Sequence, residues 1–357
     1  MRPAQPSTDD DTIRVVRRPR RKLAAVAAVL VTVAILLGAT AAWWFWPHPA
    51  SQPPATTASL PAPTVVTTLP PLAPPAAAPV PPATTPAPAP APTFEIQSAT
   101  EPQIRNDSPT DLTVFRFADN PNIIVLDFAS LHEQGKMLNR VAALMEKADL
   151  PRDRVLTDAE LDAAIVKRGD TVETFYYGHD YPAEALVHFF ALADAQHIQL
   201  DPQEERLRAL LQQLGWSGLN AVGGLISLPA VGSAPNVTLA ARTSILRHEL
   251  SHGEFFSDPD YAAYVRNFWL TALTEAERSN VRKFLASEDY DVFDEVLMYN
   301  EMQAYLMFTR DPQFFRPELV GLTPGRLADI QARFLAGMRP GWLRDVLASY
   351  QNSAAAQ

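Results

Sequence analysis

The sequence predicts an α+β domain that follows a single transmembrane helix and a proline-rich linker, and changes in composition support this order. Residues 1–22 are polar and end in a basic cluster, and residues 23–46 are apolar without one charged residue. Residues 47–93 consist almost wholly of Pro, Ala, Thr, Val, Leu and Ser, whereas residues 94–357 have an ordinary globular composition. The last range, of 264 residues, is long enough for one large core or two closely joined lobes.

Residues 23–46 are predicted to form the transmembrane helix, with residues 1–22 as a cytoplasmic tail. At about 1.5 Å per residue, this segment can cross roughly 30 Å of hydrocarbon. Seven Lys and Arg residues precede it and none lies in residues 47–93, a bias that places the N-terminus in the cytoplasm. The triplet at residues 39–41, Ala-Thr-Ala, has the form of a signal-peptidase site, so a cleaved signal peptide is the alternative. Both interpretations place the folded region in the periplasm or outside the cell.

Residues 47–93 are predicted to be a disordered linker. They hold 17 of the 33 prolines and no charged residue. Such a segment can neither pair its backbone in a regular ladder nor bury a core, so we expect an extended, polyproline-II-like tether.

The charge and the missing cysteines exclude several functions. Residues 1–22 carry a net charge of +4, so the rest of the chain carries −14 of the total of −10. A region of this charge is a poor partner for nucleic acid or anionic lipid, and we expect contact with the membrane only through residues 23–46. The absence of Cys excludes disulfides and thiol chemistry.

Residues 94–357 begin with strand patterns and continue with helical ones. Short runs rich in β-branched and aromatic residues predict strands, at 94–98, 112–117, 122–128, 225–229 and 236–242. The second and third of these read as a hairpin. Apolar periodicity and capping residues predict helices, at roughly 130–149, 158–168, 183–196 and 202–214 and over most of the chain after residue 257. We therefore expect a small sheet before the helix at residues 244–256 and a mostly helical C-terminal part.

The segment "RHELSH" is the main chemical motif of the chain. His248 and His252 are four residues apart, so on a helix both rings can point at one metal ion. Glu249 would lie beside the ion, where its carboxylate can accept a proton from water that zinc activates. Thr243 or Ser244 is the expected N-cap. The alternative is that two histidines happen to share one face of an ordinary helix.

A catalytic zinc usually has three protein ligands, and three residues are candidates for the third. Asp258 follows His248 by ten residues, as the third ligand of metzincins does, but Phe255 stands where those enzymes need glycine. His179 has no supporting spacing. Glu301 lies in "NEMQA", within an apolar helical pattern at 294–308, and a carboxylate among apolar residues needs a partner such as a metal.

The motifs HELSH and NEMQA together resemble those of the gluzincin class of zinc metallopeptidases. The resemblance implies a zincin-like fold, a Zn²⁺ ion held by His248, His252 and Glu301, and Glu249 as general base. It covers these four residues and the helical character between them, and does not extend over the first half of the folded region. It also implies that the strand at 236–242 aligns an extended peptide substrate.

The sequence does not settle which residue orients the histidines or which residue donates to the oxyanion. The class often has an acidic residue four positions after the glutamate ligand, where this chain has Tyr305, so Asp294 is our candidate for orienting the histidines. The oxyanion needs a donor besides the metal, and the candidates are Tyr299, Tyr305, Tyr261 and His179.

The sequence therefore predicts a membrane-anchored zinc peptidase that hydrolyses peptide bonds outside the cytoplasmic membrane. One alternative is a tethered, non-catalytic interaction domain whose metal is structural or lost. The other keeps the chemistry but acts on the peptide cross-links of a cell wall. The expected partner is a peptide or protein substrate, and no oligomeric state is predicted.

Overall fold

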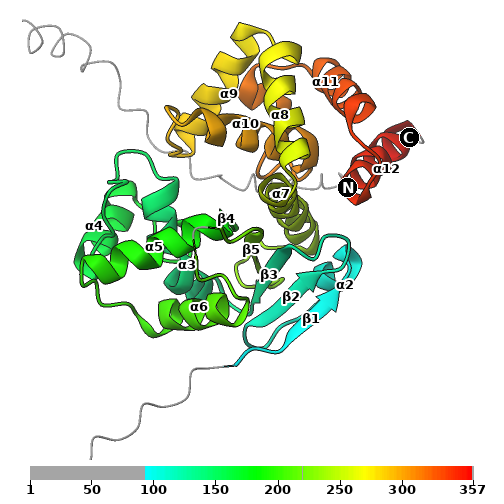
Figure 1. The fold of residues 1–357 in the computed structure, drawn as a ribbon. Helices are drawn as coiled ribbons and strands as arrows, with labels where there is room; N and C mark the ends of the chain where they lie inside the picture. The colour runs from blue at the N-terminus through cyan, green and yellow to red at the C-terminus, as the bar shows by residue number, and fades with distance from the viewer. Residues whose placement is uncertain (1–92, 219, 356–357) are drawn as a thin grey trace, which may run out of the picture. The chain divides into compact units, whose positions relative to one another are not determined.

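The structure of the protein is a computed structural model that describes residues 93–218 and 220–355 (Figure 1). These residues belong to one compact unit. The predicted cytoplasmic tail, the predicted anchor at 23–46 and all but the last residue of the predicted linker lie outside the described residues. Within the described ranges, no helix is both long enough and apolar enough to cross a membrane.

A five-stranded mixed sheet forms the centre of the N-terminal part, in the order β1-β2-β3-β5-β4. Its strands are β1 (Ile96–Ala99), β2 (Thr113–Phe117), β3 (Ile123–Phe128), β4 (His179–Pro182) and β5 (Gly224–Pro229). The antiparallel pair of β2 and β3 confirms the predicted hairpin. The central strands β3 and β5 run parallel and are buried along their whole length, as expected of runs rich in Ile, Val and Leu. The short strand β4 pairs antiparallel with β5 and forms one edge.

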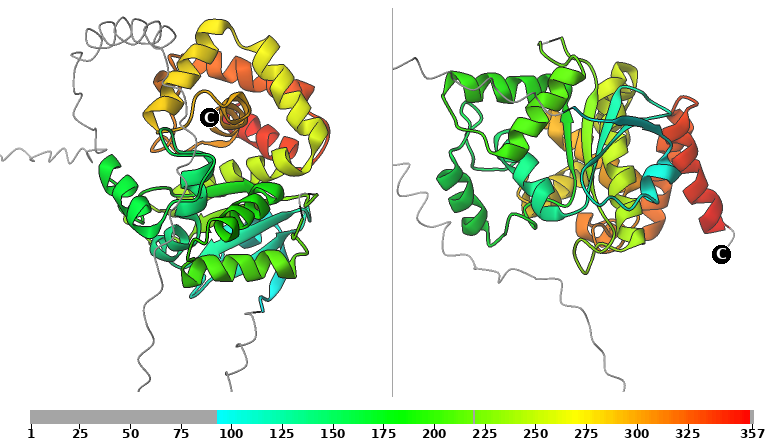
Figure 2. Two further views of the ribbon diagram at one scale, coloured as in Figure 1. Left: turned by 60° about the vertical axis from the view of Figure 1, so that its left-hand side comes forward. Right: turned by 90° about the horizontal axis from the view of Figure 1, so that it is seen from below.

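Helices cover both faces of the sheet (Figure 2). On one face lie α3 (Leu131–Met145), α4 (Asp158–Arg168), α5 (Ala183–Ala195) and α6 (Pro202–Gln213). On the other lie α2 (Glu101–Arg105) and the long helix α7 (Leu239–Ser257). Side chains alternate between the two faces along a strand, so in β3 Ile124 and Leu126 pack toward the first group and Ile123 and Val125 toward α7.

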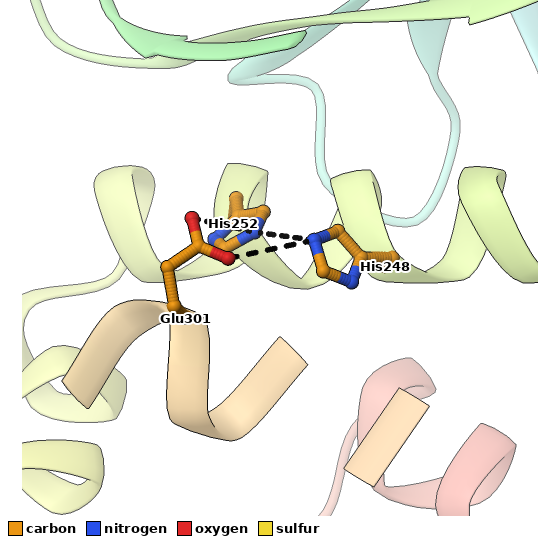
Figure 3. A group of neighbouring side chains, drawn as sticks. All are labelled: His248, His252 and Glu301. Carbon is orange, nitrogen blue, oxygen red and sulfur yellow. Dashed lines mark hydrogen bonds and ion pairs between the residues drawn. The ribbon is translucent and has the colours of Figure 1, made fainter. Parts of the chain in front are cut away.

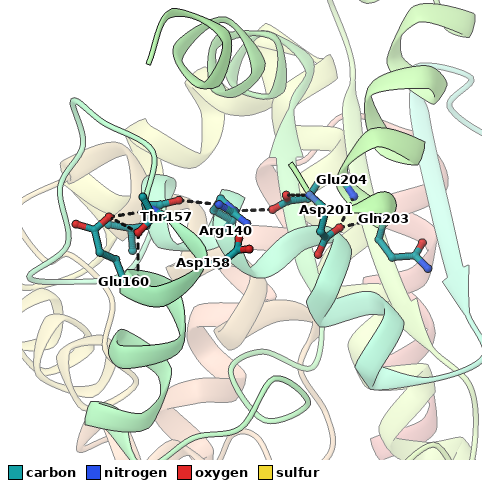
Figure 4. A network of polar contacts seen from close by, with 8 residues as sticks. Arg140, Thr157, Asp158, Glu160, Asp201, Gln203 and Glu204 are labelled. Carbon is teal, nitrogen blue, oxygen red and sulfur yellow. Dashed lines mark hydrogen bonds and ion pairs between the residues drawn. The ribbon is translucent and has the colours of Figure 1, made fainter. Parts of the chain in front are cut away.

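A buried arginine holds the first group of helices together (Figure 4). Arg140 of α3 donates from Nε to Glu204 of α6 at 2.7 Å and forms an ion pair with Asp158 at the start of α4. It also donates to the backbone carbonyl of Leu156 at 2.8 Å. These groups provide the buried guanidinium with hydrogen-bond partners and opposite charge. The cluster therefore has a structural role, which is to hold α3, α4 and α6 together.

The C-terminal part is entirely helical and has its own core. It contains α8 (Pro259–Ala272), α9 (Glu275–Ser287), α10 (Glu295–Gln303), α11 (Pro324–Gly337) and α12 (Trp342–Ala355). A π-helix (Ala304–Phe308) continues α10, and a short 3₁₀ helix lies at Pro317–Val320. Large apolar side chains such as Trp269, Phe308 and Phe334 fill this core.

The predicted fold class is wrong. We expected a small sheet, then the metal-binding helix and a mostly helical remainder, behind a transmembrane helix. Instead about 56% of the described residues are helical, and five helices, α2 to α6, are interleaved with the strands of a mixed sheet. Periodicity predicts single elements, but it does not determine how helices are distributed over the two faces of a sheet.

The predicted strand at 236–242 is also wrong, because Thr238 starts α7. Its side chain accepts a hydrogen bond from the backbone N–H of Ala241 at 3.1 Å, which is an N-cap. The N-cap therefore lies five or six residues, about one and a half turns, before the predicted caps. Of these, Thr243 lies inside the helix, and the Ser244 hydroxyl accepts from the backbone N–H groups of Arg310 and Asp311.

Two contacts fix α7 on the sheet. Arg242 and Asp127 of β3 form a fully buried bidentate ion pair, with N–O distances of 2.8 and 2.7 Å. One turn after His248, Gly253 lies against β3, where an added Cβ would come within 2.8 Å of Ile123 Cγ2. The glycine thus lets the helix approach the strand closely, and this contact fixes how far the histidine motif lies from the sheet.

Candidate metal centre

Helix α7 buries the whole HELSH motif. His248, Glu249 and His252 lie near the middle of this helix, and their exposed fractions are only 8%, 5% and 0%. Burial lowers the pKa of His252 to about 4, and burial and then the neighbouring His252 ring lower the pKa of His248 well below its usual range. Both imidazoles are therefore neutral at neutral pH, which is the form that binds a metal.

Helix α10 brings Glu301 to the two histidines (Figure 3). His248 Nε2 lies 3.1 Å from His252 Nε2 and 3.7 Å from Glu301 Oε2, and His252 Nε2 lies 3.8 Å from Glu301 Oε1. Ligand atoms about 2.0–2.2 Å from a tetrahedral zinc ion are separated by about 3.3–3.6 Å. The observed separations of 3.1, 3.7 and 3.8 Å lie within about 0.2 Å of this range, so small side-chain adjustments would let one such ion contact all three side chains.

The state of the Glu301 carboxyl also fits a bound cation. Only 1% of the residue is exposed, and its Oε2 atom has no hydrogen-bond partner among the described residues. Burial, and then the charges of Asp180 and Glu146, raise the pKa of this carboxyl well above its usual range. A buried carboxylate without a cation is costly, and a divalent ion between Glu301 and the two imidazoles would remove that cost.

The carboxyl of Glu249 lies beside this group of ligands, against the edge strand. An added Cβ on Gly178 would lie 2.0 Å from Glu249 Oε1, so only glycine leaves room for the carboxyl there. Burial and then the charge of Asp180 raise the pKa of Glu249 well above its usual range. Asp180, in β4, hydrogen-bonds to Glu249 and lies 3.7 Å from His252 Nδ1. Asp180, Glu249 and His252 thus form a second group of potential ligand atoms within 4.8 Å of one another.

The His248 ring is held by two residues that follow Glu301. Its Nδ1 atom lies 2.7 Å from the hydroxyl of Thr309. The ring of Tyr305 packs edge-on against it, with 4.8 Å between ring centroids. Of the predicted oxyanion donors, Tyr305 is therefore the one that contacts a candidate ligand.

The structure gives the other predicted residues different positions. Asp294 accepts hydrogen bonds from the backbone N–H groups of Val296 and Leu297. It therefore caps α10, which is a different role from the predicted one of orienting the histidines. Tyr299 packs against Phe255, with 5.8 Å between centroids. The prediction for Asp294 followed from helical spacing, which does not reveal that a residue is used as a cap.

The alternative third ligands and the remaining donors are also engaged elsewhere. Asp258 caps α8 and forms an ion pair with Arg339. The Tyr261 hydroxyl donates to Gln303 at 2.8 Å. His179 lies in β4, with Nδ1 3.0 Å from the Ser227 hydroxyl.

Asp180 and Thr309 are the residues of this centre that sequence reasoning missed. Asp180 comes from a strand that was not predicted, and Thr309 follows a π-helix, which has no sequence signature. Comparisons of the chain with family models, curated proteins and solved structures found no significant match.

Proposed function

We propose that the protein is a zinc-dependent hydrolase of peptide bonds. The observation that supports this best is the convergence of His248 Nε2, His252 Nε2 and the Glu301 carboxylate at separations of 3.1, 3.7 and 3.8 Å. Glu249 follows the first histidine directly and has its carboxyl next to this group. The resemblance of both motifs to those of gluzincin metallopeptidases points to the same chemistry.

His248, His252 and Glu301 would hold the ion, and Glu249 would move the proton. A bound zinc ion supplies a Lewis acid that polarises the substrate carbonyl and lowers the pKa of water to about 7. Glu249 accepts a proton as the water oxygen bonds to the carbonyl carbon, and gives it to the amine nitrogen as the C–N bond breaks. Tyr305, against the His248 ring, is the proposed donor to the developing oxyanion.

A metal-binding domain without catalysis is the second candidate. The burial of the site favours it, because none of the four residues exceeds 8% exposure and a catalytic zinc needs a position open to substrate. Under the first proposal, the segment of Gly178 and β4 has to move away from Glu249 before a peptide can bind. The two candidates therefore differ in whether Glu249 is needed for a reaction.

The test compares the full chain with its Glu249→Gln variant. We expect about one zinc per chain in both by metal analysis, and a fall in the hydrolysis of an internally quenched peptide library of about 10²–10⁴-fold in the variant. Glu254→Gln is the matched control, because Glu254 lies on the same helix and hydrogen-bonds to Asn120 and Trp342 outside the site. Full activity of Glu249→Gln contradicts the mechanism. Zinc binding with no hydrolysis by the wild-type chain supports the second candidate.

A further inference from the structure

The lack of an acidic residue four positions after Glu301 raises the question of what orients His248. The imidazole has two nitrogens, and only a nitrogen without a proton can bind a metal. In this structure His248 Nε2 faces His252 and Glu301, whereas Nδ1 faces the hydroxyl of Thr309 at 2.7 Å. Thr309 is buried, with 6% of its surface exposed, so water does not compete for this contact.

The hydrogen bonds of Thr309 determine which nitrogen of His248 carries the proton. The hydroxyl has one proton, and it donates this proton to the backbone carbonyl of Ala304 at 3.0 Å. A hydroxyl that donates to this carbonyl can only accept from the ring. The contact therefore favours the form of His248 that carries its proton on Nδ1, in which the lone pair of Nε2 is directed at the other two ligands.

The π-helix places Thr309 at this position. The backbone N–H of Thr309 also bonds to the Ala304 carbonyl at 3.0 Å, across five residues. Single π turns inside α-helices often occur at functional sites. Here the turn widens the helix between Glu301 and Thr309, so that one continuous element supplies both a candidate ligand and the hydroxyl that faces His248.

We propose that Thr309 is a positioning residue of the candidate metal centre: its hydroxyl holds His248 in the Nδ1-protonated tautomer and so presents Nε2 to the ion. The role at the metal rests on the proposed zinc site, whereas the tautomer is a property of the metal-free chain. Tyr305, which stands where the gluzincin pattern would have an acidic residue, packs on the ring edge and is not needed as a hydrogen-bond partner.

The first measurement reads the tautomer without metal. Long-range ¹H–¹⁵N spectra of the metal-free full chain, labelled at histidine, distinguish the two nitrogens, and His248→Gln identifies the signal. We expect the Nδ1-protonated form in wild type and in Thr309→Ser, and loss of its predominance in the nearly isosteric Thr309→Val. Thr243→Val is the matched control, because it also removes a hydroxyl that donates to a helix carbonyl, but outside the site. An unchanged tautomer in Thr309→Val overturns the proposal.

The second measurement is zinc affinity by chelator competition. Loss of a group that orients a ligand typically weakens metal binding about 10–100-fold, so we expect this loss in Thr309→Val and recovery in Thr309→Ser. Equal affinity of wild type and Thr309→Val contradicts the role of Thr309 and leaves the zinc site intact. Absence of zinc binding by the wild type contradicts the proposed function, and with it the role of Thr309 at a metal.

Discussion

His248 and His252 face each other through their Nε2 atoms, at 3.1 Å, inside a buried site. Neutral rings in this arrangement can offer two nitrogen lone pairs to one metal ion, and the carboxylate of Glu301 lies next to both nitrogens. At the scale of single residues, the site is thus a set of buried polar groups whose desolvation cost a bound cation would offset. Among the described residues, His179 is the other buried histidine, and it differs because protein groups satisfy its ring.

The burial of His179 predicts a dependence of stability on pH. Burial lowers its pKa to about 3 in the folded chain, against about 6.5 in the unfolded chain. The unfolded state then binds more protons, so the stabilisation is present above about pH 6.5 and is lost as the pH falls toward 3. We expect the difference in unfolding free energy between wild type and His179→Gln to shrink over this window. Urea unfolding between pH 7 and pH 4 measures it, and a difference independent of pH contradicts the account.

The histidine pair could be predicted from the sequence because the relation of its two residues is local. Two histidines four residues apart share a helix face wherever the helix lies, and Glu301 stood out as a carboxylate in an apolar stripe. Asp180 and Thr309 could not be predicted in this way. Asp180 reaches Glu249 only because β4 lies at the edge of the sheet beside α7, and Thr309 reaches His248 only because the helix after Glu301 contains a π turn.

Helix α7 is the element on which the site depends, and its position relies on glycine at its closest approach to the sheet. An added Cβ on Gly253 would lie 2.8 Å from Ile123 Cγ2 and 2.9 Å from its Cδ1. A Cβ on Gly224 of β5 would in turn lie 3.1 Å from Gly253 Cα. Gly253 therefore allows α7 to pack closely against the sheet without interrupting the helix.

Gly253→Ala is expected to destabilise the chain by up to about 2 kcal/mol, because an overpacking cost of about 1–3 kcal/mol outweighs the gain in helix propensity of about 1 kcal/mol. Chemical denaturation measures the change. Adding Ile123→Val removes one of the clashing atoms and should recover part of the loss in a double-mutant cycle. Gly325→Ala in α11 is the control, because nothing lies within 4 Å of its added Cβ. A neutral Gly253→Ala variant would show that the helix is free to shift.

Individual elements were more predictable than their arrangement. Helix α4 begins and ends as its capping box and final glycine predict. The segment at 236–242 shows the limit, because its β-branched residues favour a strand while Thr238 caps a helix. Short apolar runs satisfy both patterns, and tertiary packing decides between them.

At the scale of the whole described region, the site lies where the sheet-containing part meets the C-terminal helices. Backbone hydrogen bonds join the two parts through the segments that follow α3 and α9. The backbone N–H of Ala148 donates to the Asp289 carbonyl at 2.9 Å, and that of Asp291 donates to the Glu146 carbonyl at 3.1 Å. The His ligands come from α7 and the Glu ligand from α10, so the centre forms only when both parts are folded together. Such a long-range meeting point is not visible in any local pattern of the sequence.

X-ray absorption at the zinc edge of the zinc-loaded full chain tests the central claim most directly. The account predicts one zinc per chain with two imidazole nitrogens at about 2.0–2.1 Å and oxygen in the remaining positions. His252→Ala should remove one imidazole from the spectrum. A chain that binds no zinc, or a zinc shell without imidazole, would contradict the claim that His248, His252 and Glu301 form a metal centre.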